Sequence, residues 1–479
     1  MISAIISLYS PNYVNVIAYM LQNSEYRVGS YLKWFWRTQN FSNVIRRGTL
    51  KKTTPAVALV FGLWLGIILE IAIGLGFIWA WHSRNFTGGW EFGVALIIAY
   101  PVIMAHLVVV PLLLGRWLVI NPRNYLRVQA AERVFIDHKA VKIAVAGSYG
   151  KTTMKELLAT VLGEGKNVAA TPANKNVGVS HAIFAKNLSG KEDILIIEYG
   201  EGAPGDVARF ARLTHPSRGV ITGVAPAHLD KYKTLEAAGQ DIFSLADYLH
   251  GKHVYVNDES PAAQAFIKDK YHRYSAAGAL GWKVSGIKLA VSTTKFKLSK
   301  GKKTLDLSSK LLGRHQVGSL AFAAALGLEL GLSREQVTAG IDKTVPFEHR
   351  MQPYSLNGAW IIDDTYNGNL EGIRAGTQLL TSLPARRKIY VTPGLVDQGK
   401  ENQSVHREIG ELIAAASPDL VILMQNSVTK YIQAGLNSGK YQGELIIESH
   451  PLAFYTNLSE FVAKGDLVML QNDWPDQYV

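Results

Sequence analysis

The sequence has no cysteine, which excludes disulfide bonds and thiolate metal sites. Formal charge is almost absent from two long stretches, because residues 55–81 carry only Glu70 and residues 92–115 carry only His106. Acidic residues are fewer than basic ones, 38 against 50, which leaves a formal net charge of +12. Such an excess can indicate nucleic acid, but much of it flanks the apolar stretches, where a membrane explains it more simply. We therefore expect no nucleic-acid partner.

The two apolar stretches are each longer than the roughly 20 residues with which a helix spans a bilayer. A pair of buried core helices is the alternative, which their length and lack of charge disfavour. Several tryptophans stand near the segment ends, as in an aromatic belt: Trp64, Trp79, Trp81, Trp90 and Trp117. Basic residues lie outside the pair, at Arg27, Lys33, Arg37, Arg46, Arg47, Lys51 and Lys52 and at Arg116, Arg123, Arg127 and Arg133. Only Arg84 lies between, so the positive-inside rule predicts a hairpin with both ends in the cytoplasm.

The segment before the hairpin is also apolar over residues 1–22, but it lacks the basic start and cleavage site of a signal peptide. Residues 31–36, "YLKWFW", are typical of a segment that lies in the membrane interface, although an ordinary cytoplasmic helix also fits. Glu70 and His106 fall near the centres of their spans, where isolated charges are costly. We expect them to meet across the hairpin, or each to be neutral and bonded to a backbone carbonyl.

Residues 140–162, "AVKIAVAGSYGKTTMKELLATVL", predict a strand, a glycine turn and a helix. In such a turn, backbone N–H groups and the helix N-terminus receive phosphate, a lysine neutralises it and a threonine can ligate Mg²⁺. The residues concerned are Gly147, Ser148, Gly150, Lys151, Thr152 and Thr153. Val145 occupies the first glycine position of the strict phosphate-loop pattern, so the match is to the looser G-x-x-G-K-T. The strand before it and the helix after it favour a nucleotide site.

Two further predicted strands end in residues suited to a metal or phosphate. One lies within residues 192–210 and ends at Glu198, and the other lies within residues 218–230 and ends at His228. Ligands of open α/β sheets collect at the carboxyl ends of the strands, and a carboxylate there can hold Mg²⁺. A lone histidine is usually structural, but its place after a strand, in step with Glu198 and Lys151, favours a metal or phosphate role.

The C-terminal half alternates short β runs with helical stretches, as in residues 359–380 and 387–416. This rhythm predicts a second α/β domain with a parallel sheet, beginning near residues 345–352. No G-x-G-x-x-G occurs there, so a nicotinamide site is rejected. The lysines within residues 252–312 predict a solvated hairpin, with phosphate binding as the alternative.

A series of motifs gives these patterns a family resemblance. "GSYGKTTMKE", "TPANKNVGV", "EYGEGAPGDV", "GVITGVAPAHLD", "GRHQVGSLAFAAA", "IIDDTYNGN", "TPGLVDQGKENQSVHREIG" and "NDWPDQY" occur in this order. Together they resemble the Mur ligase family, the ATP-dependent amide-bond formers of peptidoglycan synthesis, and most of all its D-alanyl-D-alanine-adding branch. The resemblance covers about residues 139–479 and implies a P-loop central domain followed by a Rossmann-like C-terminal domain.

The expected architecture is therefore α/β, with a transmembrane two-helix hairpin in front. We expect an N-terminal segment at 1–54, the hairpin at 55–120, a connector at 121–138, the central domain at 139–345 and the C-terminal domain at 346–479.

The resemblance also implies roles for single residues. Lys151 would bind the terminal phosphates, Thr152 and Glu198 would ligate Mg²⁺, and His228 would hold a second Mg²⁺. Near the substrate it places Asn174, Asn176 and Tyr366, and near the nucleotide it places His315, Gln316, Arg350, Asp364 and Asn367. In this chemistry ATP converts a carboxylate to an acyl phosphate, which an amine then attacks. Mg²⁺ and lysine stabilise the charge that develops.

The sequence departs from the family pattern in three places. Family members usually carry a carbamylated lysine on the helix after the "AHL" motif, but residues 234–251 contain no lysine. Asp241 could supply a carboxylate instead; otherwise the second metal is weaker or activity is lost. Gln316 and Ser319 stand where asparagines are usual. The hairpin takes the place of the domain that binds the uridine nucleotide, so the acceptor could be lipid-linked or presented by a partner.

The resulting hypothesis is a membrane-anchored ligase that joins D-alanyl-D-alanine, or a similar amino acid or dipeptide, to a muramyl peptide. Its partners would be a UDP-linked or lipid-linked precursor, membrane lipid and other cell-wall enzymes. It would cross the inner (cytoplasmic) membrane of a bacterial cell twice, with its catalytic domains in the cytoplasm. The alternatives are a non-catalytic nucleotide-binding scaffold, which the missing lysine favours, and a ligase for another acidic polymer.

Overall fold

The structure is a computed structural model, and it describes residues 6–24, 26–38, 41, 50–84, 89–173, 175–226, 229–366, 368–395, 398 and 401–472. The chain folds into two compact units, unit 1 (Met1–Leu126) and unit 2 (Arg127–Val479). The finer division expected from the sequence stays a prediction.

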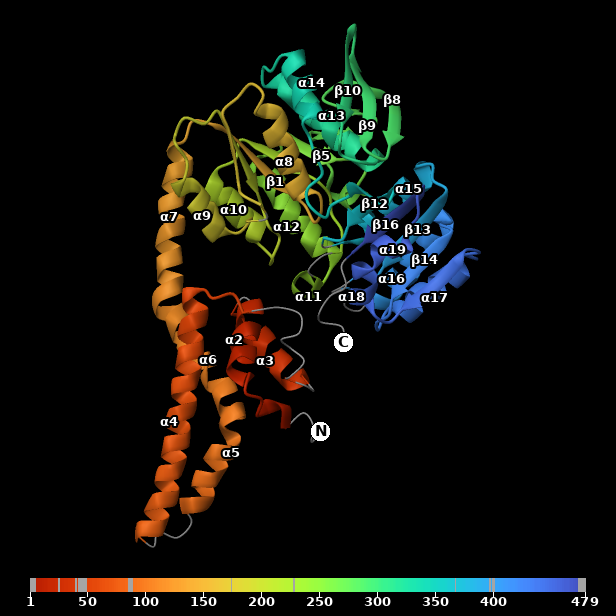
Figure 1. Cartoon of the computed structure of the whole chain (residues 1–479). Helices are drawn as coiled ribbons and strands as arrows, with labels where there is room; N and C mark the ends of the chain where they lie inside the picture. Colours follow the sequence, from red (N-terminus) through yellow and green to blue (C-terminus); the bar gives the residue numbers. More distant parts are fainter. Residues whose placement is uncertain are drawn as a thin grey trace. The chain divides into compact units, whose positions relative to one another are not determined.

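Unit 1 is helical (Figure 1). Its helices are α2 (Tyr13–Asn23), α3 (Val28–Arg37), α4 (Thr54–Arg84), α5 (Gly89–Leu107), α6 (Val109–Gly115) and the π-helical η2 (Arg116–Ile120), and α7 (Asn121–Asp137) runs on into unit 2. Helices α4 and α5 pack so closely at Gly93 that a Cβ added there would lie only 2.5 Å from Gly74 O. Small residues allow such backbone approach between apolar helices.

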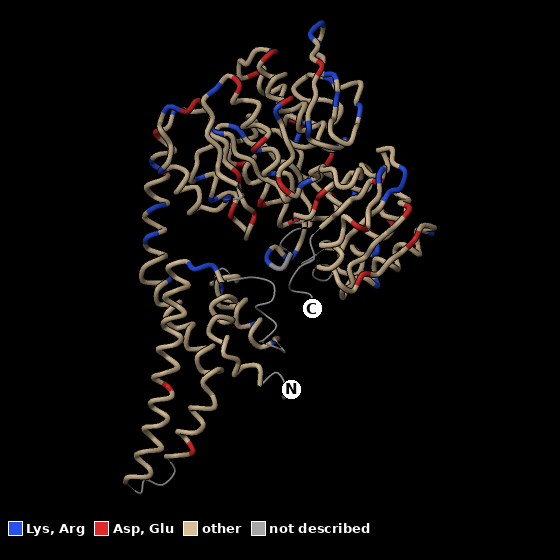
Figure 2. The backbone as a smooth tube through the Cα atoms, in the orientation of Figure 1, with Lys and Arg blue, Asp and Glu red and all other residues tan. Residues whose placement is uncertain are grey.

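Within the described part of the chain, two helical stretches are long and apolar enough to cross a membrane, Thr54–Ser83 and Gly89–Asp137. Only 22% of the most apolar window of each is buried, whereas a core helix of a soluble domain is mostly buried. Large apolar side chains such as Phe61 and Ile68 are 69% and 60% exposed. Figure 2 shows that α4 and α5 carry very few charged residues. These features are consistent with the expected hairpin.

The N-terminal helices pack on the hairpin in a shared apolar core. Tyrosine hydroxyls donate to carbonyls of α5 around Pro101: Tyr9 to Ile98 O at 2.5 Å, Tyr13 to Pro101 O, and Tyr31 to Ala105 O at 2.9 Å. A proline inside a helix removes a backbone donor and loosens the hydrogen bonds around it. The N-terminal segment therefore provides donors to carbonyl groups near the proline of α5.

The expected contact between Glu70 and His106 is not formed. His106 Nδ1 lies 2.7 Å from Val102 O, and its ring lies against Phe35 and Trp36, with centroids 5.5 and 5.4 Å away. Glu70 is buried, and neither carboxyl oxygen has a hydrogen-bond partner among the described residues. The carbonyl alternative is thus correct for His106 and wrong for Glu70. Helix rotation about its own axis decides such contacts, and residue spacing alone does not specify it.

Unit 2 begins with the middle domain, a ten-stranded sheet in the order β10-β9-β8-β7-β6-β5-β4-β1-β3-β2. Its strands are β1 (Val141–Ala146), β2 (Val168–Ala170), β3 (Ile194–Glu198), β4 (Arg218–Ile221), β5 (Val254–Asn257), β6 (His272–Ser275), β7 (Gly278–Ala279), β8 (Trp282–Ala290), β9 (Thr293–Lys300) and β10 (Lys303–Ser309). Strands β2 to β6 pair in parallel around β1, which is nearly all buried and apolar, as central parallel strands are.

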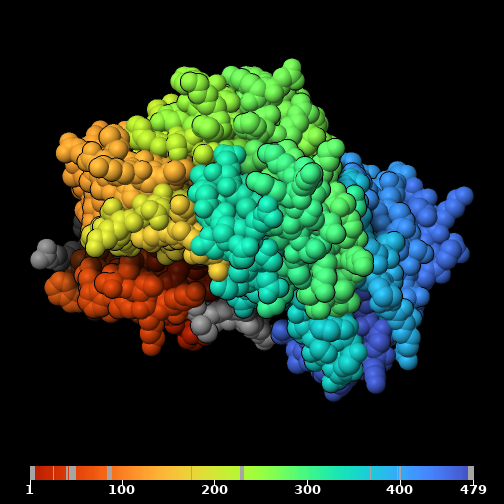
Figure 3. Space-filling view, turned by 90° about the horizontal axis from the view of Figure 1, so that it is seen from above, coloured from red at the N-terminus to blue at the C-terminus, as the bar shows by residue number. Residues whose placement is uncertain are grey.

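Helices cover both faces of this sheet and enclose two apolar cores. They are α8 (Lys151–Leu162), α9 (Gly178–Lys186), α10 (Asp206–Thr214), α11 (Leu229–Tyr232), α12 (Leu235–Tyr248), the 3₁₀ helix η3 (Pro261–Phe266), α13 (Arg314–Glu329) and α14 (Arg334–Asp342). Strands β8–β10 pair antiparallel, and their apolar side chains Phe296 and Leu298 share a core with α13. In Figure 3 the green β8–β10 segment and the teal α13–α14 segment lie side by side. Lys295 and Lys297 face solvent, as expected for a solvated hairpin.

The C-terminal domain holds a six-stranded sheet in the order β11-β12-β16-β13-β14-β15, in which only β11 is antiparallel. Its strands are β11 (Gln352–Leu356), β12 (Ala359–Asp364), β13 (Arg387–Thr392), β14 (Leu420–Met424), β15 (Glu444–Glu448) and β16 (Asp466–Gln471). Its helices are α15 (Leu370–Ser382), α16 (Asn402–Ala416), α17 (Thr429–Ser438), α18 (Pro451–Thr456) and α19 (Leu458–Phe461). The expected parallel α/β domain is confirmed.

Candidate nucleotide-binding site

The glycine turn between β1 and α8 has the backbone of a phosphate-binding loop. Gly147 and Gly150 have φ of +146° and +71°, a region that favours glycine. A Cβ at Gly147 would lie 2.2 Å from Thr222 Oγ1, so a side chain there would collide with the next strand end. Ser148 N donates to Gly223 O at 2.9 Å, and the Thr222 hydroxyl donates to Tyr149 O. The turn is therefore fixed against the end of β4.

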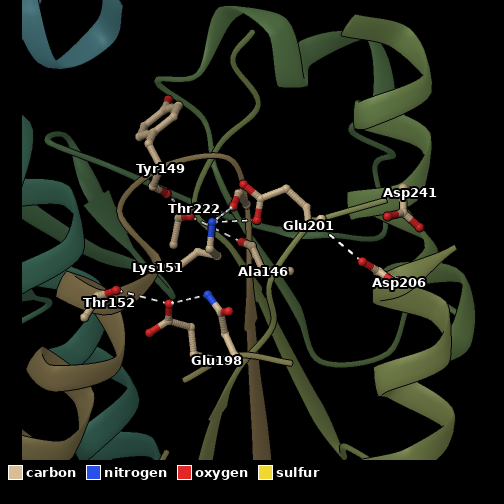
Figure 4. A network of polar contacts seen from close by, with 12 residues as sticks. Ala146, Tyr149, Lys151, Thr152, Glu198, Glu201, Asp206, Thr222 and Asp241 are labelled. Carbon is tan, nitrogen blue, oxygen red and sulfur yellow. Dashed lines mark hydrogen bonds and ion pairs between the residues drawn. The ribbon is translucent and has the colours of Figure 1, made fainter. Parts of the chain in front are cut away.

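Lys151 opens helix α8 and points back into the turn (Figure 4). Its Nζ lies 2.5 Å from Gly147 O and 2.6 Å from Glu201 Oε2. Thr152 and Thr153 follow in the first helical turn. The predicted phosphate-loop residues thus lie together at the carboxyl end of β1, where ligands of such sheets bind.

Glu198 ends strand β3, beside the phosphate loop, and is 1% exposed. Its Oε1 accepts hydrogen bonds from Thr152 Oγ1 and from Asn176 Nδ2, each at 3.1 Å. Its Oε2 makes no hydrogen bond among the described residues and has Lys155 Nζ at 3.4 Å. The structure therefore brings together three predicted residues, two for the metal and one for the substrate.

His181 contacts the backbone of Glu198. Its Nε2 donates to Glu198 O at 2.9 Å, and its ring packs against Tyr199 and Phe210. Burial lowers the pKa of His181 to about 4, so the imidazole is neutral at physiological pH. A neutral histidine at this position adds no positive charge to the carboxylate end of the strand.

These residues fit a nucleotide with Mg²⁺. The Ser148 hydroxyl oxygen is buried in the turn without a hydrogen-bond partner among the described residues, and so is Glu198 Oε2. A threonine hydroxyl, a carboxylate oxygen and phosphate oxygens form a donor set that Mg²⁺ accepts. Buried polar groups without a partner are costly, and a bound phosphate or metal would satisfy both.

Asp241 lies in α12, away from Lys151 and Glu198 (Figure 4). Its Oδ1 accepts from Gly205 N at 2.9 Å, and its Oδ2 lies 2.7 Å from the Tyr232 hydroxyl. Burial raises the pKa of its carboxyl group. These contacts tie α12 to the start of α10. A metal role for Asp241 stays a prediction.

Of the other predicted site residues, some lie in helix α13 and some fall outside the described residues. His228, Asn174 and Asn367 fall outside the described residues. His315 and Gln316 open helix α13, where their side chains contact each other at 3.0 Å between the two nitrogens.

In the C-terminal domain, Asp364 ends strand β12 and accepts hydrogen bonds from Met351 N at 3.2 Å and Gln471 Nε2 at 2.8 Å. Burial raises the pKa of Asp364 to about 7. The Arg350 guanidinium lies 4.7 Å above the Tyr366 ring, so these two predicted residues are neighbours. The predicted roles of all three toward a nucleotide or substrate remain untested.

Sequence reasoning missed two charged residues of the site. Glu201 is the ion-pair partner of Lys151, and Lys155 is fully buried beside Glu198. The signal for Lys155 was its place four residues after Lys151, which puts both on one helix face. The signal for Glu201 was its place three residues after the strand-ending Glu198, in a loop whose course the sequence did not reveal.

Two family models match this chain. The Mur ligase middle domain matches residues 145–327, and the glutamate ligase domain of Mur ligases matches residues 349–471. The fold and these matches define a two-domain α/β protein with a glycine turn at the carboxyl end of its central strand β1. The chain belongs to the Mur ligase family.

Curated relatives carry the name UDP-N-acetylmuramoyl-tripeptide–D-alanyl-D-alanine ligase. The Mycobacterium leprae protein is 27% identical over 69% of this chain and 70% of its own length. The Escherichia coli protein is 27% identical over 58% and 63%, and the Mycobacterium tuberculosis protein is 31% identical over 56% and 55%. The matched part thus spans between 55% and 70% of these relatives.

Solved structures of MurF share the fold. MurF from Thermotoga maritima in complex with ADP has a TM-score of 0.64 at 20% identity, covering 73% of this chain and 80% of its own. MurF from Acinetobacter baumannii has a TM-score of 0.63 at 19% identity, covering 73% and 77%. At these identities the likeness shows a common fold and leaves the reaction to be argued from the site.

Proposed function

We propose that the chain is a membrane-anchored, ATP-dependent amide ligase of peptidoglycan precursor synthesis. The observation that carries the proposal is the convergence of Lys151, Thr152 and Glu198 at one sheet end in a Mur ligase chain. The curated relatives are named for joining D-alanyl-D-alanine to a UDP-muramoyl tripeptide. We extend that reaction to this chain, with D-alanyl-D-alanine or a similar amino compound added to a muramyl peptide through an acyl phosphate.

In this proposal each residue of the phosphate loop has one task. The backbone of residues 147–150 and the start of α8 receive the phosphates, and Lys151 neutralises their terminal charge. Thr152 and Glu198 would hold Mg²⁺, and the hydrogen bond from Asn176 would keep the carboxylate of Glu198 in place. Mg²⁺, when bound, would offset the charge that develops on the phosphoryl oxygens.

The remaining roles follow the family resemblance. We assign a second Mg²⁺ to His228 and adenine contacts to His315 and Gln316. In the C-terminal domain we assign nucleotide contacts to Arg350, Asp364 and Asn367. Asn174, Asn176 and Tyr366 would line the substrate cleft. Asp241 is the candidate carboxylate for the helix that lacks the family's lysine.

The membrane part of the proposal rests on the two candidate spans and their exposed apolar surface. A hairpin would hold the ligase at the inner leaflet of a bacterial cytoplasmic membrane, with both domains in the cytoplasm. Lipid-linked precursors diffuse along that surface, and tethering raises their effective concentration. The acceptor would then be a lipid-linked muramyl peptide, or a UDP-linked one handed over by another cell-wall enzyme.

A scaffold that binds nucleotide without catalysis is the second candidate. The observation that favours it is the lack of a lysine in residues 234–251. A ligase for another acidic polymer is a third, which the "DDTYN" and "TPG" motifs disfavour.

The deciding experiment is release of phosphate from ATP by the full chain, supplied in turn with amino acids, dipeptides and muramyl peptides. The proposal expects release that requires both a muramyl peptide and an amine. Nucleotide binding without release under any combination would favour the scaffold. A further reaction supplies an acidic polymer with an amino acid, and release there, but not with a muramyl peptide, would favour the third candidate.

A further inference from the structure

Glu201 and a bound nucleotide would require the same cation. The Oε2 atom of Glu201 lies 2.6 Å from Lys151 Nζ, and the exposed fractions of the two side chains are only 5% and 12%. Figure 4 shows them pointing toward each other beside the phosphate loop. A phosphate in this loop also needs Lys151, since this lysine follows the turn that receives phosphate. Because one ammonium group carries a single positive charge, Lys151 cannot balance the charges of both Glu201 and a terminal phosphate.

The segment that carries Glu201 is held in place by its neighbours. Gly202 N donates to Asp206 Oδ2 at 3.2 Å, and Gly205 N donates to Asp241 Oδ1 at 2.9 Å. Ala203 O lies 3.1 Å from the Tyr232 hydroxyl. Moving Glu201 far from the phosphate loop would break such bonds, each of which contributes to stability. The carboxylate therefore stays close to the loop when a nucleotide enters.

The second lysine of the site, Lys155, already has partners of its own. Lys155 is fully buried between Glu198 Oε2, at 3.4 Å, and the Ala173 carbonyl. When Lys151 turns to a phosphate, Glu201 loses its partner and remains as a mostly buried negative charge beside the nucleotide. A buried charge whose partner is removed is strongly unfavourable.

We propose that Glu201 makes the site select metal-complexed nucleotide over free nucleotide. This inference rests on the proposed function, because it assumes a nucleotide in the phosphate loop. Free ADP or ATP would bring phosphate charge next to Glu201, where the low local dielectric strengthens repulsion. Mg²⁺ on the phosphates lowers that repulsion without any bond to Glu201. Glu201 is thus a specificity-determining residue that acts through Lys151.

The test is equilibrium binding of ADP, and of the non-hydrolysable analogue AMP-PNP, to the full chain in nanodiscs. Each affinity is measured with excess Mg²⁺ and with EDTA, for the wild type and for Glu201→Gln. Asp206→Asn is the matched control, because it removes the same charge from the same segment but contacts Gly202 N and Arg209 instead of Lys151. Lys151→Ala reports whether the nucleotide occupies the phosphate loop at all. Circular dichroism confirms that each variant is folded.

We expect Glu201→Gln to tighten binding in EDTA by about ten- to hundredfold, because repulsion in a partly buried site is large. The ratio between the Mg²⁺ and EDTA affinities should shrink by a similar factor, while Asp206→Asn changes it by less than about threefold. An unchanged ratio for Glu201→Gln would overturn the inference. Weaker binding with Mg²⁺, with no gain in EDTA, would make Glu201 a metal ligand and would also overturn it.

The proposed function is judged by different variants. If the wild type binds nucleotide and Lys151→Ala does not, the phosphate loop is established whatever Glu201→Gln does. If neither the wild type nor Glu201→Gln binds nucleotide in either condition, both proposals fall. Binding by Glu201→Gln that the wild type lacks would support the inference directly.

Discussion

The buried glutamates Glu198 and Glu70 lie in contrasting surroundings. Glu198, in the middle domain, receives two hydrogen bonds on one oxygen, and its other oxygen lies beside a lysine without a hydrogen bond from any described residue. Glu70, in helix α4, has no hydrogen-bond partner for either oxygen among the described residues and lies beside the apolar core of unit 1. Burial alone therefore does not mark a site. Donors that orient one oxygen and leave the other available are what suit a carboxylate to a metal.

We expect the largest effect from replacing Lys151, whose ammonium group faces both Glu201 and the proposed phosphate position. Lys151→Ala removes the charge that meets the terminal phosphates, and we expect ATP turnover to fall on the order of 10²–10³-fold. Phosphate release measures it, with membrane insertion and circular dichroism as controls for folding. Turnover close to that of the wild type would remove Lys151 from the mechanism.

The same substitution in both glutamates sharpens the comparison. Glu198→Gln keeps the shape of the side chain but removes its charge, and we expect Mg²⁺ to bind about 10–100-fold more weakly. Glu70→Gln should leave the Mg²⁺ requirement unchanged, because no residue of unit 1 is assigned to the proposed Mg²⁺ site. Titration of ATP turnover with Mg²⁺ compares the two variants. Equal effects would show that burial, and not the arrangement of donors, sets the metal requirement.

Removing residues 1–120 tests what the hairpin contributes. A chain that starts at residue 121 should lose about tenfold or more of its activity on a lipid-linked muramyl peptide, through the lost effective concentration. Its activity on the UDP-linked peptide should change little. The two chains are compared in nanodiscs after a check that the shorter one is folded. Efficient and equal use of both acceptors by both chains would mean that the hairpin sets location alone.

Asp241→Asn separates a structural role from a metal role. Both oxygens of Asp241 are engaged, by Gly205 N and by Tyr232, so we expect a loss of about 1–2 kcal/mol in the free energy of unfolding. Thermal unfolding measures this loss, and a Mg²⁺ titration of turnover is run alongside. A strongly raised Mg²⁺ requirement would instead support Asp241 as the carboxylate that replaces the missing lysine.

The smallest effect is a pH dependence from His181. Its folded-state pKa of about 4 lies below the ordinary value of 6.5, so the unfolded chain binds the proton more readily. Stability is therefore full above pH 6.5 and is lost as pH falls toward 4, by about 2 kcal/mol between pH 7 and pH 5. His181→Phe keeps the packing against Tyr199 and Phe210 and should flatten that slope. A slope unchanged in this variant would assign the loss to other groups.

Local pattern predicted the geometry of the strand, turn and helix around Lys151, because a strand, two glycines and a lysine at a helix start specify their own geometry. It predicted Glu198 for the same reason, since the carboxyl ends of parallel strands share one sheet edge. The pairing of Lys151 with Glu201 joins residues 50 positions apart and depends on the path of a loop. The tyrosine contacts to α5 join residues 74 to 89 positions apart, so no local sequence pattern predicts them.

The proposed reaction joins an amine to a muramyl peptide and is driven by ATP. The most direct measurement is mass spectrometry of the full chain's products after incubation with Mg²⁺-ATP, D-alanyl-D-alanine and UDP-linked or lipid-linked muramyl tripeptide. The account predicts a new amide product on at least one acceptor, formed together with one phosphate per bond and absent from the Lys151→Ala reaction. ATP bound by the wild type with no amide product from either acceptor, or from other amino acids and dipeptides, would contradict it.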